Sequence, residues 1–320
     1  MKHLFTFFLL LGCVSAFSQN TYSVCNIPTF DADFTNLQTA INTVPNGSIL
    51  IVQGSGISYG AITVNKPIIL RGTGYNLSQN AQTQANYGTS SDIGGIIFDN
   101  GSNGSEISGF SINGNINVDS VNNLTIKSNK VVGISANFMN NSIIAGNLTQ
   151  GQSYYYYYCG ASIYLVNCYN IFINNNIILD GIGGTGQSCT VVNNTFCNRV
   201  VPYYGNSTTM TMPTSSNVYN NIFLESPECY FGFSGVNLNN NLFINCGSGG
   251  YGGTYGNIDN VPSAGLFIGY PTQGAYSDDG RYQLAPGSPA IGAGVGGIDC
   301  GAFGGSTPYK LSGIAAIPNI

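Results

Sequence analysis

The sequence predicts an all-β fold, a solenoid in which short strands stack coil upon coil. One observation is an internal repeat of about 18–20 residues, the length of one small structural unit. A second is that each unit contains short apolar, β-branched runs separated by Asn and Gly, the pattern of strands joined by tight turns. A third is that no 3.6-residue hydrophobic periodicity lasts more than two turns within the repeats.

The repeat becomes visible when seven four-residue segments are aligned on their second residue, the marker. The marker number rises by 19, 18, 29, 18, 27 and 20 residues, so two units are each longer by about nine residues. The segments are GFSI (109–112), SNKV (128–131), GNLT (146–149), NNII (175–178), NNTF (193–196), NNIF (220–223) and NNLF (240–243), with markers at 110, 129, 147, 176, 194, 221 and 241.

Asn occupies most marker positions, and its chemistry suits a repeated corner. Asn tolerates left-handed backbone angles, and its amide can hydrogen-bond to the equivalent Asn one coil away, about 4.8 Å along the stack. We therefore expect the markers to form one column. Leucine-rich repeats also carry a recurrent Asn, but their L-x-x-L-x-L scaffold is absent. A disordered Asn-rich chain is excluded because 43% of the residues are hydrophobic.

The first 18 residues have the pattern of a secretory signal peptide. Lys2 and His3 precede an apolar run at 4–11, and small residues follow at 16–18. In an alternative interpretation, LLGC (10–13) is a lipoprotein box and Cys13 becomes a lipid anchor. Both interpretations predict a secreted or cell-surface protein. No later stretch reaches the roughly 18 apolar residues of a membrane helix.

Composition excludes several classes of function. His3 is the only histidine, so the mature chain would lack Ser-His and Cys-His nucleophiles and His-ligated metal sites. A net charge of −5 argues against nucleic acid or an anionic membrane as partner. Eight cysteines follow residue 18, with no C-x-x-C pair, and their even number is compatible with disulfides. A Cys159–Cys168 bridge is one hypothesis among many pairings.

An amphipathic helix is expected at the N-terminal end of the stack. Leu37, Ile41 and Val44 share one helical face within residues 33–45, and a strand is expected at 49–52. Such a helix would cover the unpaired strand edge of the first coil.

Two segments carry a resemblance to a known family. NLQTAINTVPNGSILIVQGSGISYGAITVNKPIILRGTG (36–74) resembles the opening of exported bacterial proteins of the pectin-lyase-like superfamily, and YQLAPGSPAIGAG with DCGAFGG (282–305) is similar to their closing segment. The resemblance covers about residues 20–310 and implies a right-handed parallel β-helix of about ten coils. One domain (19–320) is expected, with a helical cap at 33–45 and a closing segment at 282–320. The scaffold serves lyases, hydrolases, adhesins and structural proteins, so it does not define the activity.

The catalytic patterns that the resemblance implies are not found. Lyases of this kind hold calcium with acidic residues and use Arg or Lys as base, whereas the hydrolases use clustered Asp with a nearby His and Arg-x-Lys. SDDGRY (277–282) contains paired Asp residues, but we expect a solvated turn there.

One charged constellation does follow from the repeat. Asp180 and Glu225 lie four residues after their markers and Arg199 lies five after its own, on consecutive coils. The three side chains could bind a sugar acid or a cation, or act as acid and base. The alternative is a surface ion-pair ladder worth about 0–1 kcal/mol per pair.

Aromatic residues are the second candidate site. Five consecutive tyrosines fall within the first long interval, and other aromatics recur nine or ten residues after later markers, as Phe138 does earlier. Because strand side chains alternate, five successive tyrosines cannot all be buried. They would form an exposed face on which sugar rings stack, or they would anchor loops. The candidate ligand-binding residues are Tyr154, Tyr155, Tyr156, Tyr157, Tyr158, Tyr203, Tyr204, Tyr230, Phe231 and Tyr251.

These observations predict non-catalytic binding of an extracellular polysaccharide or cell-surface glycan through an aromatic face. The first alternative is a polysaccharide lyase or glycoside hydrolase acting on an acidic polysaccharide with Asp180, Arg199 and Glu225. The second alternative is a structural or adhesive surface module. No cofactor and no metal site are predicted, apart from calcium if the protein is a lyase. The sequence does not define the oligomeric state.

Overall fold

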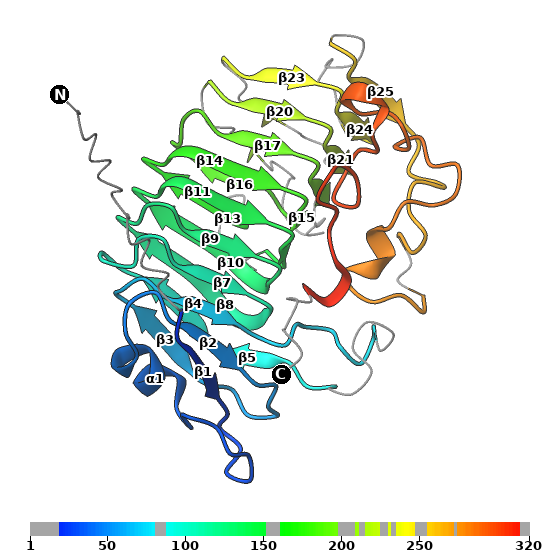
Figure 1. Ribbon diagram of the computed structural model, residues 1–320. Helices are drawn as coiled ribbons and strands as arrows, with labels where there is room; N and C mark the ends of the chain where they lie inside the picture. The colour runs from blue at the N-terminus through cyan, green and yellow to red at the C-terminus, as the bar shows by residue number, and fades with distance from the viewer. Residues whose placement is uncertain are drawn as a thin grey trace, which may run out of the picture.

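The chain forms a parallel β-helix in which each strand pairs with strands of the neighbouring coils (Figure 1). The computed structural model describes residues 19–80, 88–151, 161–197, 215–224, 235–246, 255–271 and 274–313, together with the backbone of 209–210 and 230–231. All its strand pairs are parallel, which confirms the predicted fold class. The expected signal peptide lies outside the described residues.

Face A of the helix is a sheet of ten strands that follow one another along the stack. Its strands are β1 (Thr21–Val24), β2 (Ile49–Val52), β4 (Ile69–Arg71), β7 (Glu106–Ser108), β9 (Thr125–Lys127), β11 (Asn140–Ala145), β14 (Tyr169–Asn174), β17 (Thr190–Val192), β20 (Asn217–Tyr219) and β23 (Asn237–Asn239).

A second, larger sheet bends to form faces B and C. The long strands β8 (Phe110–Asp119) and β10 (Lys130–Asn137) each contribute their first residues to face B and their last residues to face C. Face B also contains β5 (Ser91–Ile93), β12 (Leu148–Thr149), β15 (Ile177–Leu179), β18 (Thr195–Cys197), β21 (Ile222–Leu224), β24 (Leu242–Ile244) and β25 (Ile258–Val261). Face C also contains β3 (Ala61–Val64), β6 (Gly95–Phe98), β13 (Ile163–Val166) and β16 (Ile182–Gly184).

The marker residues form one column between faces A and B, as predicted. The side-chain Oδ1 of Asn147 accepts hydrogen bonds from the backbone N–H and from Nδ2 of Asn129, at 3.0 and 3.1 Å. The same two bonds join each later marker to the next, and they join the last marker, Asn241, to Asn257 on the following coil. At the other end of the column, the N–H of Phe110 donates to Asn129. The marker amides from 129 to 241 are fully buried, so these bonds satisfy polar groups that water cannot reach.

The residue before each marker carries the left-handed turn. Gly109, Ser128 and Gly146 have φ values of 75°, 54° and 61°, and the Asn residues at 175, 193, 220 and 240 have φ values between 49° and 58°. The sequence-based argument assigned the turn and the ladder to the same Asn. The structure assigns them to two consecutive residues, which explains the recurring NN pair.

The interior of the coil is apolar and in register. The central residues of β18, β21 and β24 on successive coils are Phe196, Phe223 and Phe243, and their rings stack with centroids 4.8 and 5.1 Å apart. The stack follows from the coil spacing, because equivalent inward residues lie one strand spacing apart.

A second hydrophobic core lies outside face B. The outward side chains of Leu148, Ile177, Ile222 and Leu242 are fully buried, although alternation points them away from the coil interior. Residues from Val261 onward cover them, and the orange and red chain in Figure 1 runs along this side of the stack. The covering layer therefore begins well before the predicted closing segment at 282. Its signal was the continuous apolar runs of face B, which are typical of strands buried on both sides.

The last part of this layer, residues 293–313, is here called the C-terminal strap. It runs back along the A–B corner, opposite to the direction of stacking, and the turn Asn residues of four coils bind its backbone. The contacts join Asn240 to Ala293 O, Asn220 to Val295 N, Asn193 to Asp299 O, and Asn175 to Gly304 O, at 3.1, 2.8, 2.9 and 2.7 Å.

The N-terminal helix is shorter than predicted. Helix α1 spans Leu37–Thr43 and begins after Asn36, whose side chain accepts a hydrogen bond from Thr39 N–H. Residues 33–35 are not helical, because Asp33 Oδ2 accepts the N–H of Ser23 at 2.7 Å and Phe34 bridges to β1. The helix packs against β2 and β3 at the N-terminal end of the stack. Strand β1, which the sequence did not predict, lies outside β2 on face A.

The ladder predicts a large loss of stability when one buried amide is removed. Asn194→Ala would leave the N–H and Nδ2 of Asn176 without their acceptor and would remove one donor each from Ile173 O and Val192 O. Each unsatisfied buried group costs about 1–3 kcal/mol, so we expect the free energy of unfolding in urea to fall by about 3 kcal/mol or more.

Asn237→Ala is the matched control, because Asn237 makes an exposed side-chain bond to Asn217. It should change the free energy of unfolding by less than about 0.5 kcal/mol. Equal, small losses in both variants would contradict the structural role of the ladder.

Candidate functional site

Most of the predicted site residues lie outside the described part of the chain. Arg199, Glu225, Tyr203, Tyr204 and Tyr251 are among them, as are Tyr154–Tyr158. Tyr230 and Phe231 form strand β22 (Tyr230–Phe231), which is described only as backbone and pairs with β19 (Thr209–Met210). These residues stay predictions as ligand contacts.

Asp180 is the described member of the charged constellation. It follows β15 with φ 104°, and its N–H donates to Cys197 O at 3.2 Å. Its carboxylate lies directly against Gly151, where a Cβ atom would approach Oδ2 to 1.9 Å. Residues 179, 197 and 224 are register partners on three coils, so the alignment behind the constellation holds up to the residue before Asp180. The meeting of Asp180 with Arg199 and Glu225 stays a prediction.

The shared phase predicted for the aromatic residues is wrong after each insertion. Tyr230 and Phe231 pair with Thr209 and Met210, not with Tyr203 and Tyr204 as counting from the markers predicted. Phe138 likewise meets residue 166 of the next coil, through its N–H and Val166 O, and not residue 156. The reason is that the additional residues of each long unit lie between the face B strand and the strand that follows it. The number of residues from the marker therefore no longer matches between neighbouring coils for any later position in that coil.

The described residues nevertheless include exposed aromatic side chains on two successive coils. Phe138, Tyr164, Tyr169 and Phe172, here called the aromatic band, are 49%, 48%, 46% and 39% exposed. Tyr164 points outward from face C, and its ring lies over Gly183 of the next coil. Phe172 points outward from face A beside the exposed Ile143. Phe138 and Tyr169 lie near the turns that join face C to face A.

Phe138 has an unusual backbone conformation for a bulky residue. Its φ is 53°, in the left-handed region that Asn and Gly usually occupy. Ser120 and Asn167 take this conformation at the same corner of the neighbouring coils. Such a conformation costs about 1 kcal/mol or more, and the half-exposed ring gains little from packing in return.

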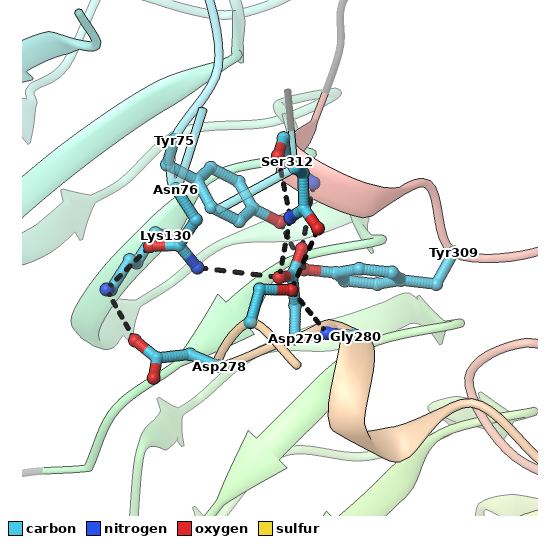
Figure 2. A network of polar contacts seen from close by, with 10 residues as sticks. Tyr75, Asn76, Lys130, Asp278, Asp279, Gly280, Tyr309 and Ser312 are labelled. Carbon is cyan, nitrogen blue, oxygen red and sulfur yellow. Dashed lines mark hydrogen bonds and ion pairs between the residues drawn. The ribbon is translucent and has the colours of Figure 1, made fainter. Parts of the chain in front are cut away.

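The paired Asp residues of SDDGRY do not form the solvated turn that was expected. Asp279 is fully buried, whereas Asp278 lies at the surface and forms an ion pair with Lys130 at 3.0 Å. Figure 2 shows the network around the two carboxylates, which joins the chain near residue 76, strand β10 and the end of the strap. The tertiary fold brings these segments together, and the short motif alone carried no sign of it.

Asp279 is held by donors from two segments, near residues 76–80 and 309–312. Its Oδ1 accepts from Asn80 Nδ2 at 3.2 Å and from Asn76 Nδ2 at 3.5 Å. Its Oδ2 accepts from Ser312 N–H at 2.8 Å and from the Tyr309 hydroxyl at 3.3 Å. Both oxygens are therefore occupied by N–H and O–H donors, an arrangement that fixes a buried carboxylate in place.

Two phenols border the same carboxylate. The hydroxyls of Tyr75 and Tyr309 hydrogen-bond to each other, and both side chains are fully buried or nearly so. Burial raises the pKa of Tyr75 and of Tyr309 well above the ordinary value, and the charge of Asp279 acts in the same direction. Both phenols therefore stay protonated and available as donors.

The Cys159–Cys168 disulfide is not supported. Cys168 is a fully buried free thiol whose Sγ donates to Val166 O at 3.2 Å, and Cys159 lies outside the described residues. Cys189 is also a buried free thiol. Burial raises the pKa of Cys189 to about 11 and raises the pKa of Cys168, so neither is a reactive thiolate at neutral pH.

The residues that the structure describes contain neither a cluster of metal ligands nor a membrane-spanning helix. Within these residues, no three His, Cys, Asp or Glu side chains converge as metal ligands would. None of the helices found there has the length and apolar character needed to cross a membrane.

Comparisons with known proteins give one relevant finding. The crystal structure of pectate lyase Pel9A is similar to this chain, with 13% sequence identity, coverage of 89% of this chain and 96% of that chain, and a TM-score of 0.39. No protein-family model matches the chain, and no curated protein matches it. A likeness this weak carries no argument about activity, and the fold assignment rests on the strand pairing described above.

The thiols provide a test with a defined dependence on pH. In the folded protein at about pH 8, iodoacetamide should leave Cys168 and Cys189 unmodified, because a buried thiol with a raised pKa is neither accessible nor ionised. After denaturation without reductant, both should be alkylated, as peptide mass spectrometry would show. Failure of Cys168 to react then would mean that it is in a disulfide.

The raised pKa of the Cys189 thiol predicts that the folded protein loses stability in alkali. The pKa of Cys189 is 9.0 in an unfolded chain and about 11 when folded, so above pH 9 ionisation favours the unfolded state. Its contribution to the free energy of unfolding should be complete below pH 9 and should decline between about pH 9 and 11. Cys189→Ala should reduce that decline.

Proposed function

We propose that this protein binds an extracellular polysaccharide through the aromatic band without cleaving it. The observation that carries the proposal is the exposure of four aromatic side chains, Phe138, Tyr164, Tyr169 and Phe172, on neighbouring coils. Tyr164 lies in β13, shortly after the connection from β12 in which the sequence places Tyr154–Tyr158. Sugar rings present apolar C–H faces, and exposed aromatic rings are the protein surface that packs against them.

The rest of the described fold supports this choice of surface. Face B is covered by residues 261–313, so faces A and C are the long surfaces left open in the described ranges. The exposed side chains of Asn141 and Asn170 lie beside the aromatic band and hydrogen-bond to each other at 2.8 Å. Uncharged amides of this kind suit the hydroxyl groups of a sugar polymer.

The backbone of Phe138 adds a second argument. A half-exposed ring held in the left-handed region costs folding energy without a matching gain from packing. Residues in such conformations cluster at ligand-binding sites, where contact with a partner offsets the cost. Phe138 therefore supports a binding surface on this corner.

A second candidate function is cleavage of an acidic polysaccharide with Asp180, Arg199 and Glu225. The register of residues 179, 197 and 224 favours it, because it aligns the segments that carry these three side chains. Arg199 would then act as base or charge stabiliser, with calcium as a partner if the reaction is elimination.

The aromatic band predicts the effect of two substitutions on binding. Tyr164→Ala combined with Phe172→Ala removes two outward rings and should weaken binding to the responding polysaccharide by about tenfold, since each stacked ring contributes very roughly 0.5–1.5 kcal/mol. An array of plant, algal and bacterial polysaccharides would identify the ligand, and affinity electrophoresis would measure the change.

Tyr276→Ala is the matched control, because Tyr276 is 43% exposed but lies in the layer that covers face B. It should leave binding unchanged. The proposal is wrong if no polysaccharide binds the parent protein, or if both variants bind as the parent does. Release of unsaturated or reducing sugar ends by the parent would instead support the catalytic alternative.

A further inference from the structure

Lys130 lies at the meeting point of three segments that are far apart in the sequence. Its Nζ donates to Asn76 Oδ1 at 3.0 Å and forms an ion pair with Asp278 Oδ2 at 3.0 Å. The side chain of Lys130 is only 18% exposed. Figure 2 shows the amine directed at the carboxamide, with the two Asp side chains on either side. An amine and a carboxamide are thus in contact within a partly dry environment.

The carboxamide of Asn76 is held from its other end as well. Its Nδ2 donates to Oδ1 of the fully buried Asp279 at 3.5 Å. The amide oxygen therefore meets the cation and the amide nitrogen meets a carboxylate. The cation at Oδ1 polarises the carbonyl group and makes Cγ more open to attack by a nucleophile.

We propose that Lys130 and Asn76 form an intramolecular isopeptide bond. The bond between Lys130 Nζ and Asn76 Cγ forms, and the bond between Cγ and Nδ2 breaks. The ammonium group and the carboxamide become one secondary amide and one ammonium ion, so atoms and charge balance. No oxidant, reductant or activating co-reactant is required.

The two carboxylates have separate roles in this step. Asp278 accepts a proton from the Lys130 ammonium, which must become a neutral amine before it can attack. Asp279 holds Nδ2, and the leaving nitrogen takes the second proton of the attacking amine and the proton held by Asp278, so that it departs as an ammonium ion. A rotation about the Asn76 side chain brings Nζ from the edge of the carbonyl over its face. Nζ lies 3.0 Å from Oδ1, the oxygen bonded to Cγ, and this rotation would bring Nζ toward the 3–3.5 Å from Cγ of a productive approach.

The bond would tie β10 to the chain that follows β4, closing a loop between residues 54 positions apart. Asn80, four residues after Asn76, donates to Ser312 in the strap and to Asp279, which in turn accepts the N–H of Ser312. A covalent link here would therefore restrain the unfolded chain and fix the position where the strap ends. It would do so where the described thiols of Cys25, Cys168, Cys189 and Cys300 form no disulfides.

Intact-mass spectrometry of the folded protein tests the proposal. We expect a mass lower than that of the sequence by one ammonia, and proteolysis should release a branched peptide that joins residue 76 to residue 130. Lys130→Arg keeps the positive charge but should restore the full mass. Asn76→Gly should do the same, and glycine suits the φ of 50° at this position. Asp278→Asn should slow the mass loss in freshly folded protein.

Loss of ammonia from an Asn-Gly pair is the main alternative source of the same mass change. It would persist in Lys130→Arg and would map to Asn46, Asn100, Asn103 or Asn113 rather than to a branched peptide. A folded parent protein with the full sequence mass and no branched peptide would overturn the proposal, as would a mass loss that Lys130→Arg does not abolish. Circular dichroism confirms that each variant is folded before its mass is interpreted.

Discussion

The hydrogen-bonded column of buried Asn side chains is the constraint on which the rest of the structure depends. Each marker amide accepts from the backbone and side chain of one neighbour and donates to the next, so no coil can slip without leaving buried polar groups unsatisfied. The fixed register then places identical inward residues above one another, as in the stack of Phe196, Phe223 and Phe243. Apolar packing stabilises the coils, and the amides define their alignment.

The second consequence of the column is the position of the strap. Where the residue before the marker is Asn, its side chain points to the chain that covers face B, and four such residues bind the strap backbone. In the earlier coils the same position is Gly or Ser at 109, 128 and 146. The NN pair therefore encodes both a turn and a docking position. With face B covered, the proposed polysaccharide ligand is expected on the remaining faces, where the aromatic band lies.

Much of the fold could be predicted because the length of the repeat equals the length of one coil, so equally spaced residues occupy equivalent positions. Equal spacing placed the markers in one column, and the short apolar runs indicated strands joined by tight turns. Spacing failed beyond the insertions, because additional residues before Tyr230 and Phe231 shift their partners to Thr209 and Met210. It also could not place Asp279, whose burial depends on Asn80 and Ser312, residues remote in sequence. The helix began late because Asp33 and Phe34 bind β1 instead.

Amide hydrogen exchange tests the central claim most directly. The backbone N–H groups of Asn147, Asn176, Asn194 and Asn221 lie in turns, yet each is bonded to a buried side-chain oxygen. They should exchange as slowly as the N–H groups of the flanking strands, that is, only when the coils unfold together. Exchange at the rate of exposed turns, with the strands still protected, would show that the amide column does not hold the coils in register.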